Sequence, residues 1–321
     1  MRLRNKALMT LGVILVGLLA VLYAASALIL RHSFIALEEQ YTRRDLQRIE
    51  DALAQQRNAL SMLTFDWAVW DDTYTFIADH NPDYVNSNLV ESLSENLGLS
   101  LILFVDLDGE VVYLRHYDRE EGVFLPTPDD WIAALLAHEQ LFAVEEAIDD
   151  LLRLPHGLIV VSAHPILTSE EAGPARGTLV MGRYMDALAL AQLSELTHLS
   201  LALYTEPPEA LQAQYAEIIA TGERQIVPLD RDTVAGYTLL EDVEGQPLAL
   251  LEIESPRDIF AQGRLTTYAF TVALLAAGVL FGALALWLLQ HGLLTRLARM
   301  GQEVAALGQQ GDLNARVSVE G

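Results

Sequence analysis

Two apolar segments constrain this 321-residue chain more than any other feature of its sequence. Residues 7–30 and 266–289 contain no Asp, Glu, Lys or Arg. A helix of either length can cross about 30 Å of hydrocarbon. We therefore predict two transmembrane helices, with an intervening segment of residues 31–265.

Basic residues flank both apolar segments on the side away from residues 31–265, namely Arg2, Arg4, Lys6, Arg296 and Arg299. Positive flanks stay in the cytoplasm, so we expect residues 1–6 and 290–321 to be cytoplasmic and residues 31–265 to lie outside the cell (inner) membrane. A cleaved signal peptide is the alternative, because Ala25-Ser26-Ala27 fits a cleavage site. The apolar run continues past it to Leu30, which favours a retained helix.

The charge balance limits the partners. The chain has 44 Asp and Glu, 20 Lys and Arg and a net charge of −24, and most of the acids fall within residues 31–265. An acidic surface repels nucleic acid, so we expect no nucleic-acid partner. The same surface either keeps the domain soluble or attracts cationic ligands and divalent metals.

Cofactor and metal sites are not predicted. Cysteine is absent, which excludes disulfides and thiolate ligands. Five histidines of the outer segment are candidate metal ligands but lack the close spacing of such ligands: His80, His116, His138, His156 and His164. Asp106 to Gly109 fits a hairpin turn better than a calcium loop, since the distal ligands of an EF-hand are missing.

Periodicity predicts a long helix first, with apolar residues three and four apart between Leu46 and Trp67. Strands are then predicted at 99–105 and 110–114, joined by the turn at 106–109. A helix at about 129–152 and strands at 157–163 and 177–183 follow. This order favours an antiparallel sheet covered on one side by helices.

A second unit repeats the pattern, because the strand-like residues 199–204 echo 99–104. We predict a helix at 208–220 and strands at 225–229, 234–240 and 247–253. The fold class is then α/β (α+β), with two stacked lobes at about 31–190 and 191–260. The boundary between the lobes falls at about 186–198.

Beyond the second apolar segment, five apolar residues alternate in spacings of four and three: Leu293, Leu297, Met300, Val304 and Leu307. This is the pattern of a coiled-coil seam, and Gly311 ends it. The stretch 290–321 resembles the first helix and connector of a HAMP signal-relay module, although no proline stands near Thr295. The resemblance implies a homodimer, and we expect an incomplete relay because the sequence stops before a second HAMP helix.

Aromatic and acidic residues gather at the end of the predicted long helix and just after it. Six of them and one asparagine are candidate ligand-binding residues: Trp67, Trp70, Asp71, Asp72, Tyr74, Tyr84 and Asn88. On one continuous helix, Trp67, Trp70, Asp71 and Tyr74 would share a face. Rings beside a carboxylate suit a cationic or amine ligand. The alternative is that the tryptophans anchor the core and the aspartates cap a helix.

This cluster, followed by a strand pair with the Asp106 to Gly109 turn, resembles the fourth CHASE-type family of extracytoplasmic sensor domains over most of residues 35–200. The resemblance implies a PAS-like or Cache-like sensor fold. Members of that family are joined to HAMP modules and then to diguanylate cyclase, cyclic-di-GMP phosphodiesterase or histidine kinase domains. It also implies a bacterial inner-membrane location with a periplasmic sensor.

We therefore expect a receptor input module that senses an unknown small molecule or periplasmic protein, with cyclic-di-GMP synthesis or degradation as the first choice of output. The alternative is the input module of a sensor histidine kinase or chemoreceptor. No catalytic motif is present, so we expect no enzyme in this chain. A membrane-anchored interaction protein, or a hydrolase using Asp71 and Asp72, fits the sequence less well, because adjacent helical residues diverge by about 100°.

Overall fold

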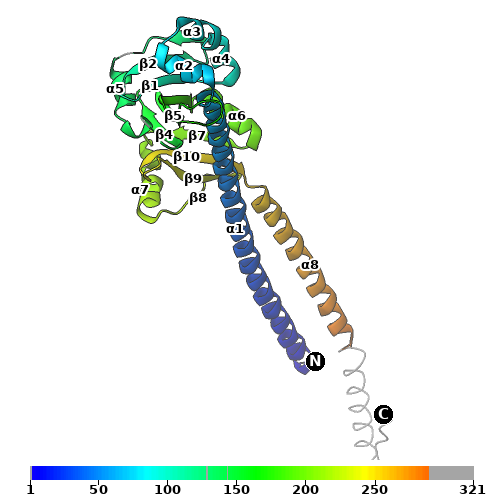
Figure 1. Ribbon diagram of the computed structural model, residues 1–321. Helices are drawn as coiled ribbons and strands as arrows, with labels where there is room; N and C mark the ends of the chain where they lie inside the picture. The colour runs from blue at the N-terminus through cyan, green and yellow to red at the C-terminus, as the bar shows by residue number, and fades with distance from the viewer. Residues whose placement is uncertain (1, 128, 143, 289–321) are drawn as a thin grey trace, which may run out of the picture. The chain divides into compact units, whose positions relative to one another are not determined.

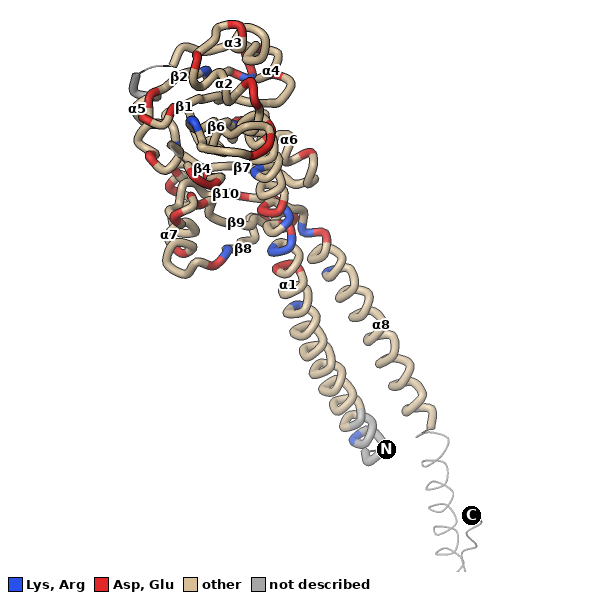
Figure 2. Tube along the Cα trace, in the orientation of Figure 1, with Lys and Arg blue, Asp and Glu red and all other residues tan. Residues whose placement is uncertain are grey.

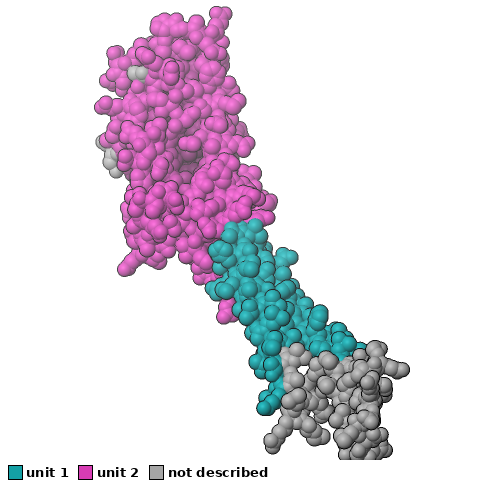
Figure 3. All heavy atoms as spheres, turned by 90° about the horizontal axis from the view of Figure 1, so that it is seen from below, with its two compact units in different colours: residues 1–38, 258–321 teal, residues 39–257 magenta. Residues whose placement is uncertain are grey.

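The computed structural model describes residues 2–127, 129–142 and 144–288. The chain divides into two compact units (Figure 3). One is Glu39–Arg257, and the other combines Met1–Glu38 with Asp258–Gly321. The predicted seam at 293–307 lies outside the described residues.

The second of these units contains the first part of α1 (Arg2–Ala68) and α8 (Asp258–Leu288) (Figure 1). Both helices are long and apolar enough to cross a membrane, as predicted for residues 7–30 and 266–289. Glycines of α8 lie against α1: a Cβ at Gly263 would come within 2.6 Å of the Phe34 ring, and one at Gly282 within 3.2 Å of Leu15. Small residues at such contacts allow helices to pack closely in a membrane.

The unit Glu39–Arg257 is built on two antiparallel sheets among the described residues. The first sheet has the strand order β3-β2-β1-β6-β5-β4. Its strands are β1 (Leu101–Asp106), β2 (Val111–Asp118), β3 (Val123–Leu125), β4 (Ile148–Leu154), β5 (Gly157–Pro165) and β6 (Gly177–Tyr184). The two strands predicted around the turn at 106–109 are β1 and β2. This combination of helices and strands agrees with the α/β (α+β) class that the sequence predicts.

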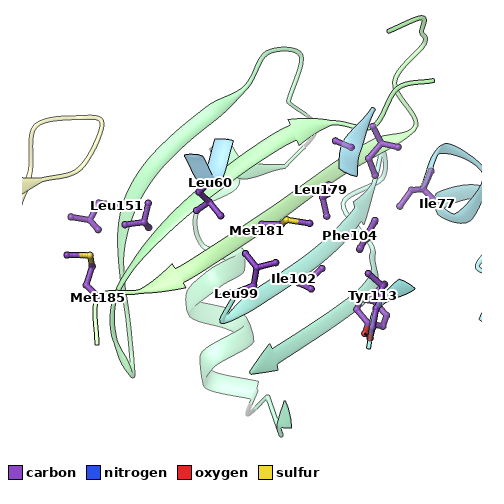
Figure 4. Packing of buried hydrophobic residues seen from close by; sticks show 14 of the residues in the cluster. Leu60, Ile77, Leu99, Ile102, Phe104, Tyr113, Leu151, Leu179, Met181 and Met185 are labelled. Carbon is purple, nitrogen blue, oxygen red and sulfur yellow. The ribbon is translucent and has the colours of Figure 1, made fainter. Parts of the chain in front are cut away.

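One face of the first sheet is covered by the end of α1 and by three short helices, α2 (Asp71–Asp79), α3 (Pro82–Asn88) and α4 (Glu91–Leu97). Figure 4 shows Leu60 of α1 over β6, the strand that carries Met181 and Leu179, with Phe104 and Ile102 of β1 on the same face. Phe76 and Tyr84 extend this core with stacked rings, 4.4 Å between centroids.

The opposite face is also covered, which corrects the prediction of helices on one side only. Trp131 and Leu135 of α5 (Asp129–Leu136) pack on Leu101, Leu103 and other apolar residues of the sheet. Strand β1 is buried on both faces because its run of apolar residues is unbroken. A second correction concerns the predicted helix 129–152. It ends at Leu136, and β4 follows because residues 148–154 pair with β5 across the turn before Gly157.

The second sheet has the order β7-β10-β9-β8. Its strands are β7 (Ser200–Tyr204), β8 (Gln225–Pro228), β9 (Thr233–Glu241) and β10 (Pro247–Pro256). Two helices precede and follow β7, α6 (Ala187–Thr197) and α7 (Gln212–Thr221). Leu46 and Ile49 of α1 pack on Leu251 and Ile253 of β10. The same helix therefore contributes to the cores of both sheets.

Candidate functional site

The Trp/Asp cluster surrounds a break between two helices. Helix α1 ends at Ala68, Val69 forms a parallel bridge with Leu167, and Trp70 is extended (φ −138°, ψ 131°) before α2 begins. The Leu167 N–H donates to the Ala68 carbonyl at 3.1 Å. Backbone pairing with a distant loop thus replaces the next helical turn. The prediction that Trp67, Trp70, Asp71 and Tyr74 share one helical face is wrong for this reason.

Asp71 and Tyr74 hold the loop that follows β5. The Asp71 carboxylate accepts the Ser169 N–H at 2.9 Å, and the Asp71 N–H donates to Ser169 Oγ at 3.1 Å. The Tyr74 hydroxyl donates to the Pro174 carbonyl at 3.1 Å, and the Arg176 guanidinium lies 3.9 Å from the Tyr74 ring centroid. Both residues therefore fasten α2 to this loop.

Tyr84 is a core residue. Its hydroxyl hydrogen-bonds the buried Thr73 hydroxyl at 2.6 Å, and its ring stacks on Phe76. Burial raises the pKa of Tyr84 to about 12, with Thr73 acting in the opposite direction and the nearby Asp72 adding to the rise. The hydroxyl is therefore neutral near pH 7 and serves as a hydrogen-bonding group.

Four of the seven predicted residues line one cleft of about 460 Å³, which we call the Trp70 cleft: Trp70, Asp72, Tyr84 and Asn88. Trp67 lies behind it, with its ring edge-on to Trp70 at 5.8 Å between centroids. Asp71 and Tyr74 are not among the residues that line it. The predicted cluster is thus divided into residues that line the cleft and two residues, Asp71 and Tyr74, that bind the loop after β5.

Two further acids line the Trp70 cleft that were not among the predicted site residues, Asp79 and Asp83. Asn81 stands between them and caps α3, since its side chain accepts the Asp83 N–H at 2.9 Å. The sequence signal for this helix start was Asn81 followed by Pro82. Figure 2 shows the acidic residues along α2 and α3.

The chemistry of the Trp70 cleft fits an organic cation. It offers three carboxylates, no Lys or Arg and an aromatic wall at Trp70. Flat apolar contact and cation–π attraction from such a wall complement a charge-assisted hydrogen bond from a carboxylate. In the described ranges, no group of three His, Asp or Glu side chains could hold a metal ion.

Comparison with known proteins finds a family similarity in the region that contains this cleft. Residues 52–204 match the model of the CHASE4 domain. The chain is 29% identical over 282 residues to the methanogenesis regulatory histidine kinase FilI of Methanothrix harundinacea (strain 6Ac), an alignment that covers 85% of this chain and 31% of that protein. The chain therefore spans about a third of the length of this curated relative.

Solved sensor domains are similar at lower levels. The periplasmic domain of Vibrio cholerae LuxQ is 13% identical with a TM-score of 0.45, covering 67% of this chain and 99% of that one. The sensor domain of the V. cholerae histidine kinase DctB is 9% identical with a TM-score of 0.37, covering 70% and 98%.

The family match starts within α1, includes the first sheet and both helices that line the Trp70 cleft, and ends with β7. It confirms the resemblance that the Trp/Asp cluster and the Asp106 to Gly109 turn suggest. Residues 52–204 of this chain are therefore similar to the CHASE4 domain.

Proposed function

We propose that this chain is the sensory input module of a membrane-bound histidine kinase. The observation that carries the proposal is the 29% identity to a histidine kinase, because it extends over 282 residues and so well beyond the CHASE4 match. Cyclic-di-GMP turnover, the first choice from the sequence, gives way to the kinase alternative on this ground. The chain itself acts by binding and relay, without a reaction of its own.

The connections between the sensor and the apolar helices support a relay. Helix α1 continues without interruption from its apolar segment into the cores of both sheets. At the other end, only Arg257 separates β10 from α8. A ligand that prefers one of two packings of these elements would shift the equilibrium between them.

The Trp70 cleft is the proposed entry point for the signal, and an organic cation is its proposed ligand class. Asp72 is the best-placed carboxylate, since it is exposed and lines the cleft while the neighbouring Asp71 is engaged with Ser169. This division also weighs against the hydrolase alternative, because the two carboxylates face different surroundings. The alternative signal is a periplasmic protein, and the following experiment distinguishes it from an organic cation.

A fusion experiment tests the proposal. The catalytic core of a histidine kinase is joined after Gly321, and autophosphorylation is measured in membrane vesicles with putrescine, agmatine and choline as probes. We expect at least one of these cations to change the rate in the wild type and to lose its effect in Asp72→Asn. Asp108→Asn, an exposed acid in the turn between β1 and β2, is the matched control and keeps the response.

Two results would contradict the proposal at different levels. A rate that stays the same when residues 39–257 are deleted would remove the sensor role. A response only to periplasmic extract, with none to the cations, would retain the sensor and replace the ligand class.

Topology and assembly form the second part of the proposal: α1 and α8 cross the membrane, both termini are cytoplasmic, and two copies pair along the seam at 293–307. The chain has no cysteine, so single cysteines report cleanly. Met62→Cys, at a side chain that is 70% exposed, should react with a membrane-impermeant maleimide from outside, whereas Gln309→Cys should not.

Leu297→Cys should form a disulfide-linked dimer on oxidation; failure to do so in membranes would exclude pairing along this seam.

A further inference from the structure

A second cavity, separate from the Trp70 cleft, lies where α1, α4, β6 and α6 meet. Its volume is about 330 Å³, within the range of small-molecule sites. We call it the arginine cavity, because Arg119 and Arg183 both line it. The two arginines are far apart in the sequence and come together only through the pairing of β2, β1 and β6.

The two guanidinium groups converge on one point. A Cβ placed on Gly98 would lie 3.8 Å from an Arg119 nitrogen and 3.9 Å from Arg183 Nε. Gly98 ends α4 in the left-handed conformation (φ 63°), where a side chain would be strained. A residue without a side chain thus stands between α4 and the two cations.

These cations are only partly neutralised. Arg183 donates from one terminal nitrogen to the Leu97 carbonyl at 2.8 Å, but its Nε is buried and has no hydrogen-bond partner among the described residues. Arg119 is 11% exposed, and its closest carboxylate oxygen, on Asp186, is 3.7 Å away. The Asp186 carboxylate is shared, because its other oxygen caps α6 by accepting the Ala189 N–H at 2.7 Å. Burial, together with the adjacent Arg119, lowers the pKa of Arg183.

Such an arrangement favours an anion. Two like charges in a partly desolvated site repel each other, and a buried donor without a partner costs free energy. A carboxylate would accept hydrogen bonds from both guanidinium forks, the geometry that arginine recognises best. The remaining wall combines the buried apolar side chains of Leu60, Val160 and Met185 with the polar side chains of Gln56, Asn96 and Gln192.

Glu95 narrows the choice of anion. This exposed acid also lines the cavity, and its negative charge disfavours ligands with two or more negative charges, such as phosphate or dicarboxylates. An anionic head with one charge and a short apolar tail matches both the cations and the apolar part of the wall, at Leu60, Val160 and Met185.

We propose that the arginine cavity binds a small organic monocarboxylate, held through its carboxylate by Arg119 and Arg183. Gln56 and Leu60 place α1 in the wall of this cavity, so the bound ligand contacts the helix that runs on into the first apolar segment. The site is independent of the Trp70 cleft and of the kinase output, and it is tested by binding alone.

The test uses the full chain in detergent micelles, with thermal unfolding and calorimetric titration as readouts. Propionate and butyrate are the probes, propionamide is the neutral control, and all samples have the same ionic strength. We expect a saturable rise in melting temperature with the two carboxylates and none with propionamide, since a ligand that binds only the folded state stabilises it.

Variants then assign the site. Arg119→Gln should weaken propionate binding at least tenfold, as should Arg183→Gln. Arg119→Lys keeps the positive charge but loses the forked guanidinium, so it should bind propionate more tightly than Arg119→Gln and less tightly than the wild type. The matched control is Arg153→Gln, a half-exposed arginine whose nearest carboxylate is 3.9 Å away on Glu206, and it should bind like the wild type.

Arg183→Gln also removes the hydrogen bond to the Leu97 carbonyl, so this variant is at risk of misfolding. If it misfolds, the propionate affinity of Arg119→Gln decides the test. Equal effects of propionate and propionamide would overturn the proposal, as would wild-type affinity in Arg119→Gln. Tighter binding of inorganic phosphate than of propionate would overturn the assignment to monocarboxylates. The kinase fusion described above takes no part in these measurements, so failure here leaves the proposed receptor function intact.

Discussion

Adjacent aspartates at the start of α2 should respond differently to the same substitution. Asp71 accepts the Ser169 N–H at 2.9 Å and stands in the first turn of α2, whereas Asp72 lines the Trp70 cleft. Asp71→Ala removes a charge-assisted hydrogen bond at an exposed site, worth about 1 kcal/mol, and a favourable helix-end charge, worth roughly 0.3–1 kcal/mol. We expect the free energy of unfolding to fall by about 1–2 kcal/mol.

Asp72→Ala is the matched control, because it also removes a first-turn carboxylate but no link to the loop. It should cost only the helix-end contribution, roughly 0.3–1 kcal/mol. For a domain of this size, about 1.5 kcal/mol corresponds to a fall of roughly 3–6 °C in melting temperature. Tryptophan fluorescence during thermal and urea unfolding measures both variants. Equal losses in the two variants, or a neutral Asp71→Ala, would refute the assignment of Asp71 to the loop and Asp72 to the cleft.

Three other substitutions test the core and its titration. Gly182→Ala should destabilise the protein by about 1–3 kcal/mol, because the new Cβ would lie 2.8 Å from Ile159 Cδ1. Valine lacks that carbon, so the double variant Gly182→Ala, Ile159→Val should lose less stability than the sum of the two single losses, as measured by urea unfolding. Burial lowers the pKa of His116, so the stability that its neutral form contributes is present above the unfolded pKa of about 6.5 and is lost as the pH falls. His116→Gln should therefore flatten the decline in the free energy of unfolding between about pH 7.5 and 5.5, and an unchanged slope would contradict this. Tyr237→Phe should cost about 1–3 kcal/mol, because the buried Glu252 loses a hydrogen bond of 2.8 Å; a change below about 0.5 kcal/mol in thermal unfolding would show that this bond contributes little.

Local patterns in the sequence predicted most of the strands and the long helix. The largely apolar residues 99–105, with Ser100 as the one polar member, predicted a buried strand, and β1 occupies Leu101–Asp106. The apolar spacing along α1 predicted a helix to Trp67, and the helix ends at Ala68. These features depend on residues close in the chain, so their periodicity alone was informative.

Tertiary contacts decided what the sequence could not show. No Pro or Gly marks the break at Ala68, since its cause is the pairing of Val69 with Leu167. The predicted helix 129–152 failed because residues 148–154 have a partner in β5. Asp72 and Asn88 were predicted as site residues from their proximity in sequence, whereas Arg119 and Arg183 were not, because only the strand order brings them together.

The continuity of α1 has a geometrical consequence for any receptor built on this chain. Each residue of an α-helix turns the chain by about 100°, and α1 runs through Glu38 and Glu39 without interruption. One residue inserted between them would rotate the apolar segment by about 100° about the helix axis relative to Leu46 and Leu60, which the two sheets hold in place. Seven inserted residues would restore the original direction to within about 20°. Insertions of different length at this point therefore change the angular phase of the helix in steps of about 100° per residue.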